Sequence, residues 1–248
     1  MTSPDTLSKT EDRLVEHYTA DRPIVQVQET TALTPAQMRE YSIITPEAMG
    51  QPMVDAFRDI RTRLLAAAGD QNIVTLVVPV SPGSGGSFVA RNLAAAVAFD
   101  ESKSAVLVDC DLRQPSQHTT MHVDAKNGGL LSYLENPATL VSDILYETGV
   151  PRLRLIPAGG TPSRHGEYFS SFRMRLLIDS LRSRYPDRYL FLDGPPVRGA
   201  PDARILSEIA DVIVLVAGYG RDTADDIARA AANFDPNKFA GVVFNEDV

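Results

Sequence analysis

The sequence contains no tryptophan and a single cysteine, Cys110, among its 248 residues. A lone cysteine excludes an intrachain disulfide framework and fits a reducing cytoplasm. No apolar run approaches the roughly 20 residues that span a bilayer, and residues 1–5 are too polar and acidic to begin a signal peptide. These absences favour a soluble globular protein.

Basic residues are also in short supply. There are 24 lysines and arginines against 32 aspartates and glutamates, so the net charge is −8. Proteins that bind nucleic acid broadly do so through many Lys and Arg contacts to phosphate. We therefore expect no nucleic-acid partner.

Short apolar runs rich in β-branched residues alternate with segments whose apolar residues recur at helical spacing. Strands are predicted at residues 73–78, 105–111, 153–157, 189–193, 212–217 and 240–245. Helices are predicted at residues 46–68, 88–99, 128–134, 140–145, 167–184 and 223–233. Such alternation implies right-handed parallel crossovers. The predicted fold class is α/β, with one doubly wound, mostly parallel sheet and helices on both faces.

The first part of the chain differs from the rest. Residues 1–45 are polar, carry several prolines and lack a sustained period, so they are predicted to form a flexible N-terminal arm. A short helix capped by Thr34 is expected within it. Residues 46–248 are predicted to form a single domain.

A glycine-rich turn, residues 77–87, lies between the predicted strand 73–78 and the alanine-rich helix 88–99. In that context free backbone N–H groups and the positive end of the helix dipole point at one spot. The residues expected to bind phosphate are Gly83, Ser84, Gly85, Gly86 and Ser87. The P-loop pattern Gly-x-x-x-x-Gly-Lys-Ser/Thr has lysine where this chain has Gly86. The alternative is a turn of the same shape that binds nothing.

Carboxylates follow two of the predicted strands. Asp109 and Asp111 close one strand and, because side chains alternate, should project to the same side, with Cys110 on the other as plain core. Asp193 closes another strand in the manner of a Walker B aspartate. Ligands of open α/β sheets bind at this end of the strands, and carboxylates there suit magnesium and its waters.

The helix predicted at 46–68 carries Asp55, Arg58 and Arg61 at every third position. These side chains share one side of the helix and can pair with each other or with a neighbouring molecule. A solvated polar face is the alternative reading.

Three segments taken together resemble the Walker A, A′ and B motifs of bacterial tyrosine kinases. They are residues 81–87, 106–115 and 191–196. Residues 55–64 are similar to the Glu-x-x-Arg-x-x-Arg oligomerisation helix of that family, with Asp55 in place of Glu, and the resemblance continues to residue 245. The family comprises cytoplasmic kinases of capsule and exopolysaccharide systems, with a P-loop NTPase-like fold related to that of partition and cell-division ATPases.

The resemblance implies roles for several residues. Ser87 would hold Mg²⁺ of Mg-ATP or Mg-ADP, Asp109 or Asp111 would act on the incoming hydroxyl, and Asp193 would orient a metal-bound water. It also implies homo-oligomers through Asp55, Arg58 and Arg61. The implied partner is an integral-membrane polysaccharide chain-length (co-polymerase) protein, which would hold the chain at the inner face of the plasma membrane.

Two features depart from the family pattern. Gly86 replaces the lysine that binds the β- and γ-phosphates, and losing one charge-assisted contact costs on the order of 1.5–3 kcal/mol of binding. The C-terminal tyrosine cluster of the family is missing, since the last tyrosine is Tyr219. The cations considered as substitutes for the lysine are Arg113, Arg164, Arg198 and Arg221, with Arg91 less suitably placed on the helix.

Three hypotheses follow. The favoured one is a degenerate bacterial-tyrosine-kinase homologue that acts as a regulatory or scaffold component of exopolysaccharide or capsule biosynthesis and export. The second is an active ATP-dependent protein-tyrosine kinase of the same system, with another cation supplied. The third is a partition-type ATPase, which the absence of lysine from residues 77–83 and the net charge of −8 disfavour.

Overall fold

The computed structural model describes residues 32–48, 50–69, 71–160 and 168–246, and within them one sheet of seven strands. Every neighbouring pair is parallel except the short edge pair β3–β4. From one edge to the other the strands are β3 (Tyr146–Glu147), β4 (Leu153–Ile156), β2 (Ser104–Asp109), β5 (Arg188–Asp193), β1 (Val74–Pro79), β6 (Val212–Gly218) and β7 (Phe239–Asn245). The predicted doubly wound, mostly parallel sheet is confirmed.

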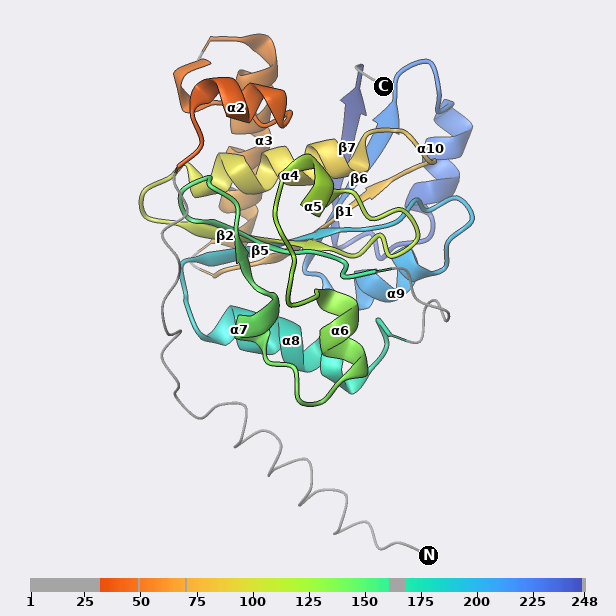
Figure 1. The fold of residues 1–248 in the computed structure, drawn as a ribbon. Coiled ribbons are helices and arrows are strands. Elements are labelled where there is room, and N and C mark those ends of the chain that lie inside the picture. Colours follow the sequence, from red (N-terminus) through yellow and green to blue (C-terminus); the bar gives the residue numbers. More distant parts are fainter. Residues whose placement is uncertain (1–31, 49, 70, 161–167, 247–248) are drawn as a thin grey trace, which may run out of the picture.

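Helices cover both faces of this sheet, as predicted. Figure 1 shows α3 and α4 on one side and α6, α8 and α9 on the other. The helical segments are α2 (Pro35–Glu40), the 3-10 turn η1 (Pro46–Ala48), α3 (Pro52–Ala68), α4 (Gly86–Ala98), α5 (Gln117–Thr120), α6 (Leu130–Glu135), α7 (Val141–Ile144), α8 (Phe172–Ser183), α9 (Asp202–Ile209) and α10 (Ala224–Ala231).

The two layers follow from the alternation of side chains along buried strands. In β1, Leu76 and Val78 pack into the core beneath α8 and α9, whereas Val77 packs into the core beneath α3 and α4. All of β1 is buried. A strand that is buried at every position is what a sheet covered on both faces produces.

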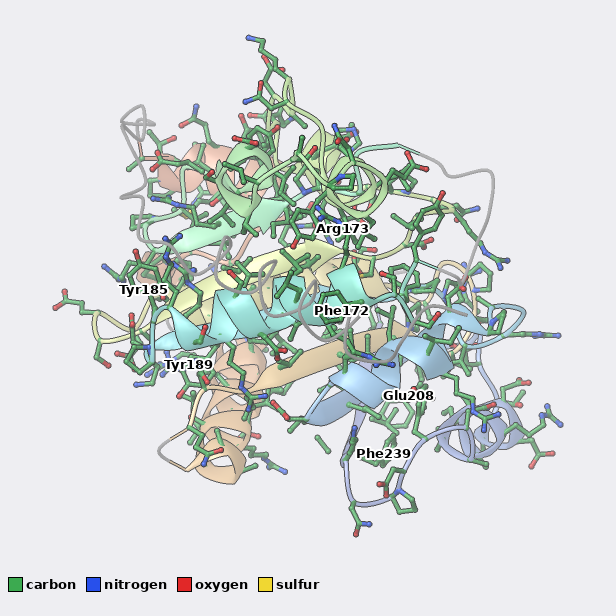
Figure 2. All side chains as sticks on the ribbon, turned by 90° about the horizontal axis from the view of Figure 1, so that it is seen from below. Phe172, Arg173, Tyr185, Tyr189, Glu208 and Phe239 are labelled. Atoms are coloured by element: carbon green, nitrogen blue, oxygen red, sulfur yellow. The ribbon has the colours of Figure 1, made fainter. Side chains whose placement is uncertain are left out.

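The face covered by α8 and α9 is the one seen in Figure 2. Arg173 at the start of α8 lies over the ring of Tyr133 in α6, 4.2 Å from its centroid. Its Nε also donates to the backbone oxygen of Tyr133 at 2.8 Å. This contact holds α6 against α8.

Some helices begin elsewhere than predicted. The helix expected from residue 46 starts with the turn η1, is interrupted at Gly50 (φ 90°), and resumes as α3 at Pro52. Proline favours the first helical position because it has no N–H to satisfy. The helix expected from residue 167 begins at Phe172, because the Ser171 side chain caps it by accepting from the N–H of Met174. The helix α9 and the edge strand β3 were not predicted.

The predicted arm, residues 1–45, is only partly within the described residues. Residues 1–31 lie outside them, but the later residues pack against the domain. The expected short helix is present as α2, with a capping box at Thr34, and Met38, Ile43 and Ile44 are buried against α3 and α4. Residues 35–44 therefore pack as part of the domain, because burying three apolar side chains is more favourable than leaving them in water.

Candidate functional site

The glycine-rich turn connects the end of β1 to the start of α4. Gly83 and Gly85 have φ values of 81° and 87°, a region that glycine enters without strain. A Cβ at Gly85 would lie 1.9 Å from Nδ2 of Asn245 at the end of β7. The turn therefore has the tight backbone of a phosphate cradle, with the first amides of α4 at its base.

Gly86 packs against the ring of Pro79, the last residue of β1. A Cβ at Gly86 would lie 2.5 Å from Cδ and 2.8 Å from Cγ of Pro79, closer than real atoms approach. A proline ring cannot swing aside as a long side chain does. Any side chain at position 86 thus requires the loop or Pro79 to move. The P-loop pattern also has glycine five residues before Gly85, where this chain has Val80.

Asp222, in the loop between β6 and α10, stabilises the glycine-rich turn by hydrogen bonds. Its carboxylate accepts from the hydroxyl of Ser84 at 2.6 Å, from the hydroxyl of Ser81, and from the N–H of Gly218 at 2.8 Å. Charge-assisted hydrogen bonds of this kind are the stronger ones. The Ser84 hydroxyl therefore stabilises the conformation of the loop.

Two predicted carboxylates are brought together by strand register. Asp109 of β2 and Asp193 of β5 are directly paired residues of neighbouring parallel strands, and both are fully buried. Among the described residues, Oδ1 of each is buried without a hydrogen-bond partner. Burial raises the pKa of Asp109 well above its usual range, and the charge of Asp193 adds to this. Burial raises the pKa of Asp193 to about 6.

Asp111 lies on the same side but has a different local role. Its Oδ1 accepts from the backbone N–H groups of Arg113 and Gln114, at 3.2 and 3.1 Å, which turns the chain away from the sheet. Its charge raises the pKa values of both Asp109 and Asp193. Cys110 points into the opposite core, as predicted, and burial raises the pKa of its thiol.

Gln117, the first residue of α5, links the two carboxylates to α4. Its Nε2 donates to Oδ2 of Asp193 at 2.6 Å and to the backbone oxygen of Ser87 at 2.9 Å. Its N–H donates to Oδ2 of Asp109 at 3.1 Å. Its Oε1 accepts from Nη1 of Arg91 at 3.0 Å. Gln117 therefore joins both carboxylates to α4, through its backbone N–H to Asp109 and its side-chain amide to Asp193.

Of the cations considered as lysine substitutes, Arg221 lies at the turn. Its Nη1 donates to the backbone oxygen of Pro82 at 3.3 Å, and its guanidinium covers Gly83. Arg113 instead pairs with Asp202 at 3.4 Å.

The remaining three are placed differently. Arg198 lines a cavity of about 330 Å³ between Val80 and α10, Arg91 is buried against Gln117, and Arg164 lies outside the described residues.

The oxygens at the carboxylate end of the site suit Mg²⁺. The orphaned Oδ1 atoms of Asp109 and Asp193 are oxygen ligands of the type Mg²⁺ and its waters prefer. The Ser87 hydroxyl lies close enough to Asp193 to lower the pKa of that carboxyl. Within the described residues no three His, Cys, Asp or Glu side chains are grouped to hold a metal by themselves. The residues therefore fit a Mg²⁺ that takes most of its ligands from phosphate and water.

The proposed oligomerisation residues lie on α3. Arg58 pairs with Asp55 at 3.7 Å, and both side chains are about half exposed. Arg61 turns inward, and its Nη1 donates to the backbone oxygen of Ala96 in α4 at 3.0 Å. Of these three residues, only Asp55 and Arg58 therefore present their charges outward.

Sequence reasoning missed Pro79, Gln117 and Asp222. Asp222 follows the carboxyl end of β6, where ligands of α/β sheets bind, so its position offered a signal. Gln117 offered none, because its role depends on which strands become neighbours, and Pro79 offered none, because its role depends on how the turn folds back on the end of β1.

Fold and site together define a P-loop NTPase-like α/β domain in which the cradle and the paired carboxylates are present and the lysine is absent. Comparison with proteins of known sequence places it more narrowly. The chain belongs to the bacterial tyrosine kinase family.

The chain is 31% identical over 204 residues to the tyrosine-protein kinase Wzc of Salmonella typhimurium, a match that covers 80% of this chain and 28% of Wzc. It is 29% identical over 192 residues to the tyrosine-protein kinase CpsD of Streptococcus agalactiae, covering 77% of this chain and 82% of CpsD. The chain thus spans under a third of the length of the longer curated relatives. No protein-family model matches it.

Solved structures agree on the fold. The kinase domain of the Escherichia coli tyrosine kinase ETK superposes with a TM-score of 0.74 at 22% identity, over 90% of this chain and 84% of that one. The chimerical protein CapA2B2 gives 0.72 at 24% identity, over 96% and 97% of the two chains. The septum site-determining protein MinD of Pyrococcus horikoshii, in complex with Mg-ADP, gives 0.54 at 19% identity, over 71% and 70%. None of the helices in the described residues has both the length and the hydropathy to cross a membrane.

Proposed function

We propose that this chain is a degenerate bacterial tyrosine kinase that acts as a regulatory or scaffold component of exopolysaccharide or capsule biosynthesis and export. One observation carries the proposal. Gly86 stands at the lysine position, and the ring of Pro79 fills the space in which a side chain there would begin. The loss of the lysine is thus built into the packing of the loop.

Nucleotide binding is expected to be weakened rather than abolished. The backbone of residues 83–87 and the start of α4 still present N–H groups to a phosphate. The missing charge-assisted contact costs on the order of 1.5–3 kcal/mol, which is about a 10- to 150-fold loss of affinity. Phosphoryl transfer suffers more, because charge develops on the γ-phosphate in the transition state. When bound, Mg²⁺ would be held by Ser87 and reached through water by Asp109 and Asp193.

Calorimetry with Mg-ADP and Mg-ATP tests this proposal. The variants are Gly86→Lys, Pro79→Gly and the double substitution. Gly86→Lys alone is expected to bind no better than wild type, because its Cβ meets Pro79, whereas the double variant should bind at least about tenfold more tightly. Pro79→Gly alone is the control for loosening the loop.

The enzymatic half of the proposal has its own test. Purified wild type incubated with Mg-ATP is expected to give no phosphotyrosine in an immunoblot or by mass spectrometry. Robust ATP-dependent phosphotyrosine on the purified protein would contradict the proposal.

Arg221 favours a second candidate, an active kinase of the same system with a replacement cation. Its guanidinium already covers Gly83 of the cradle. On this reading Arg221→Ala would lower the affinity for Mg-ATP about tenfold or more. An affinity unchanged by Arg221→Ala would remove the candidate. No observation favours a partition-type ATPase, since the likeness to MinD extends to the fold alone.

The partner and location follow from family membership as proposals. We expect an integral-membrane polysaccharide chain-length protein to bind this domain and hold it at the cytoplasmic face of the plasma membrane. Co-purification of the tagged chain with such a protein from detergent-solubilised membranes, lost in cells that lack the protein, is the expected result.

A further inference from the structure

Arg91 is a buried charge that no motif of the chain explains. It lies in the second turn of α4, and only 4% of its surface is exposed. Its Nη1 donates to Oε1 of Gln117 at 3.0 Å, and its Nε donates to the backbone oxygen of Ser42 at 3.5 Å. A buried guanidinium is costly unless anions or oxygens compensate it. The groups that face it explain why it is there.

The two carboxylates of the site, Asp109 and Asp193, are buried groups of the opposite charge that also need compensation. Asp109 and Asp193 are fully buried side by side, and none of the ion pairs between described residues involves either of them. The charge of Arg91 acts on this pair, since it lowers the pKa of Asp193 against the effect of burial. Gln117 is the physical link, because it accepts from Arg91 and donates to both carboxylates.

We propose that Arg91 is a positioning residue of the carboxylate site. Through Gln117 it supplies the counter-charge for Asp109 and Asp193 while no cation is bound, so that Arg91 and a bound divalent cation are alternatives. The inference rests on the assignment of these carboxylates to the metal side of the nucleotide site, as given under Proposed function.

The arrangement has a consequence for cation binding. Oδ2 of Asp193 is engaged at 2.6 Å by the amide of Gln117, which also bonds to the backbone of Ser87. A cation that binds the unpartnered Oδ1 of Asp193 shares a carboxylate whose other oxygen is already bonded to this amide, and the nearby guanidinium repels the cation. The chain thus has a second reason, besides Gly86, to hold Mg²⁺ weakly.

Arg91→Met tests the proposal, because methionine keeps much of the buried aliphatic volume and removes the charge. The melting temperature is measured in chelator and in millimolar Mg²⁺ without nucleotide. Mg²⁺ is expected to raise the Tm of the variant by about 3 °C or more and that of wild type by less than about 1 °C. The matched control is Arg152→Met, since Arg152 also donates to α4, at the backbone oxygen of Ala98, and should behave as wild type.

A double-mutant cycle separates the counter-charge from mere packing. If Arg91 compensates the carboxylates, Asp193→Asn should relieve part of the instability of Arg91→Met, so the double variant melts higher than the two separate effects predict. Additive effects would overturn the proposal, and so would an Arg91→Met variant that Mg²⁺ leaves unchanged.

If Arg91→Met fails to fold, wild type supplies the test. The side-chain amide hydrogens of Gln117 are expected to lose protection from exchange when Mg²⁺ is raised to saturation, followed by nuclear magnetic resonance. Protection unchanged throughout the titration overturns the proposal. Failure here is distinguishable from failure of the proposed function, which is decided by phosphotyrosine formation with ATP.

Discussion

At the scale of single residues, the site is governed by close packing around glycine. Gly85 has a left-handed backbone, and a Cβ there would meet Asn245, while Gly86 faces Pro79. Gly85 is therefore required by a neighbour distant in sequence, and Gly86 by a proline seven residues earlier in the same turn. Substitutions in the turn should act through these neighbours rather than through the turn alone.

Gly85→Ala should destabilise the fold more than a matched substitution does. Gly199 has nearly the same φ, 86° against 87°, but nothing lies within 4 Å of its Cβ position. Both variants carry the strain of a left-handed alanine, about 1 kcal/mol, and only Gly85→Ala adds the clash with Asn245. We expect an additional loss of about 1–3 kcal/mol in urea unfolding. Equal losses would show that Asn245 moves away freely.

Asp193 should make stability depend on pH in a defined direction. Burial raises its folded-state pKa from 3.8 to about 6. Its contribution to the unfolding free energy is therefore complete below about pH 4 and is lost as pH rises through 6. Two pKa units correspond to about 2–3 kcal/mol. The unfolding free energy of wild type relative to Asp193→Asn should fall by about that amount between pH 4 and pH 7. If the difference in unfolding free energy between wild type and Asp193→Asn stayed constant from pH 4 to pH 7, burial would not be raising the pKa of Asp193.

At the scale of elements, the segment before α3 belongs to the α4 face. Asn92 of α4 accepts from the N–H of Ile44 at 2.8 Å and donates to the backbone oxygens of Ser42 and Phe88, each at 3.0 Å. These bonds fix the path of the backbone beside the buried Ile43 and Ile44. The packing of α2 therefore depends on a side chain of α4, the helix that follows the glycine-rich turn.

Asn92→Ala should release this segment. Loss of its buried hydrogen bonds is expected to cost about 2 kcal/mol and to speed hydrogen exchange at Ile44 and in α2. The control is Asn233→Ala, because Asn233, in the turn after α10, makes a similar bond to the adjoining helix, at the oxygen of Arg229 at 2.8 Å, and links no separate segment through it. Similar exchange in the two variants would mean that burial of Ile43 and Ile44 alone holds the segment.

At the scale of the whole molecule, the charged residues of α3 predict that the chain associates with further copies of itself. Arg58 and Asp55 are half exposed, whereas Arg61 is turned toward α4. An interface through this helix therefore rests mainly on the first two charges. A ring built on them should be sensitive to salt, since exposed ion pairs are screened.

Arg58→Glu should reduce the oligomer mass seen by light scattering after size exclusion. Arg63→Glu is the control, because Arg63 lies on the same helix, is 78% exposed and pairs only with Asp59 among the charges of the described residues. The expected result is dissociation by the first substitution alone. A wild type that is already monomeric would show that the predicted interface is wrong.

The sequence by itself determined the layers of this protein. Buried runs such as Val74–Pro79 must form interior strands, and alternation with amphipathic helices leaves few other arrangements. It also indicated Asp109, Asp111 and Asp193, because carboxylates at strand ends meet at one edge of a parallel sheet. Local pattern was sufficient for these features, since each depends on periodicity or on position within a strand.

Tertiary structure alone decided how the site is built. Asp109 and Asp193 are directly paired only because β2 and β5 are neighbours, and Pro79 blocks position 86 only through the geometry of the turn. Gln117 and Arg91 gain their roles from the same proximity. Contacts between different elements leave no periodic trace in the sequence, and neither does the approach of Pro79 to Gly86 within one turn. The role of Gly86 could therefore be understood only together with its neighbours in space.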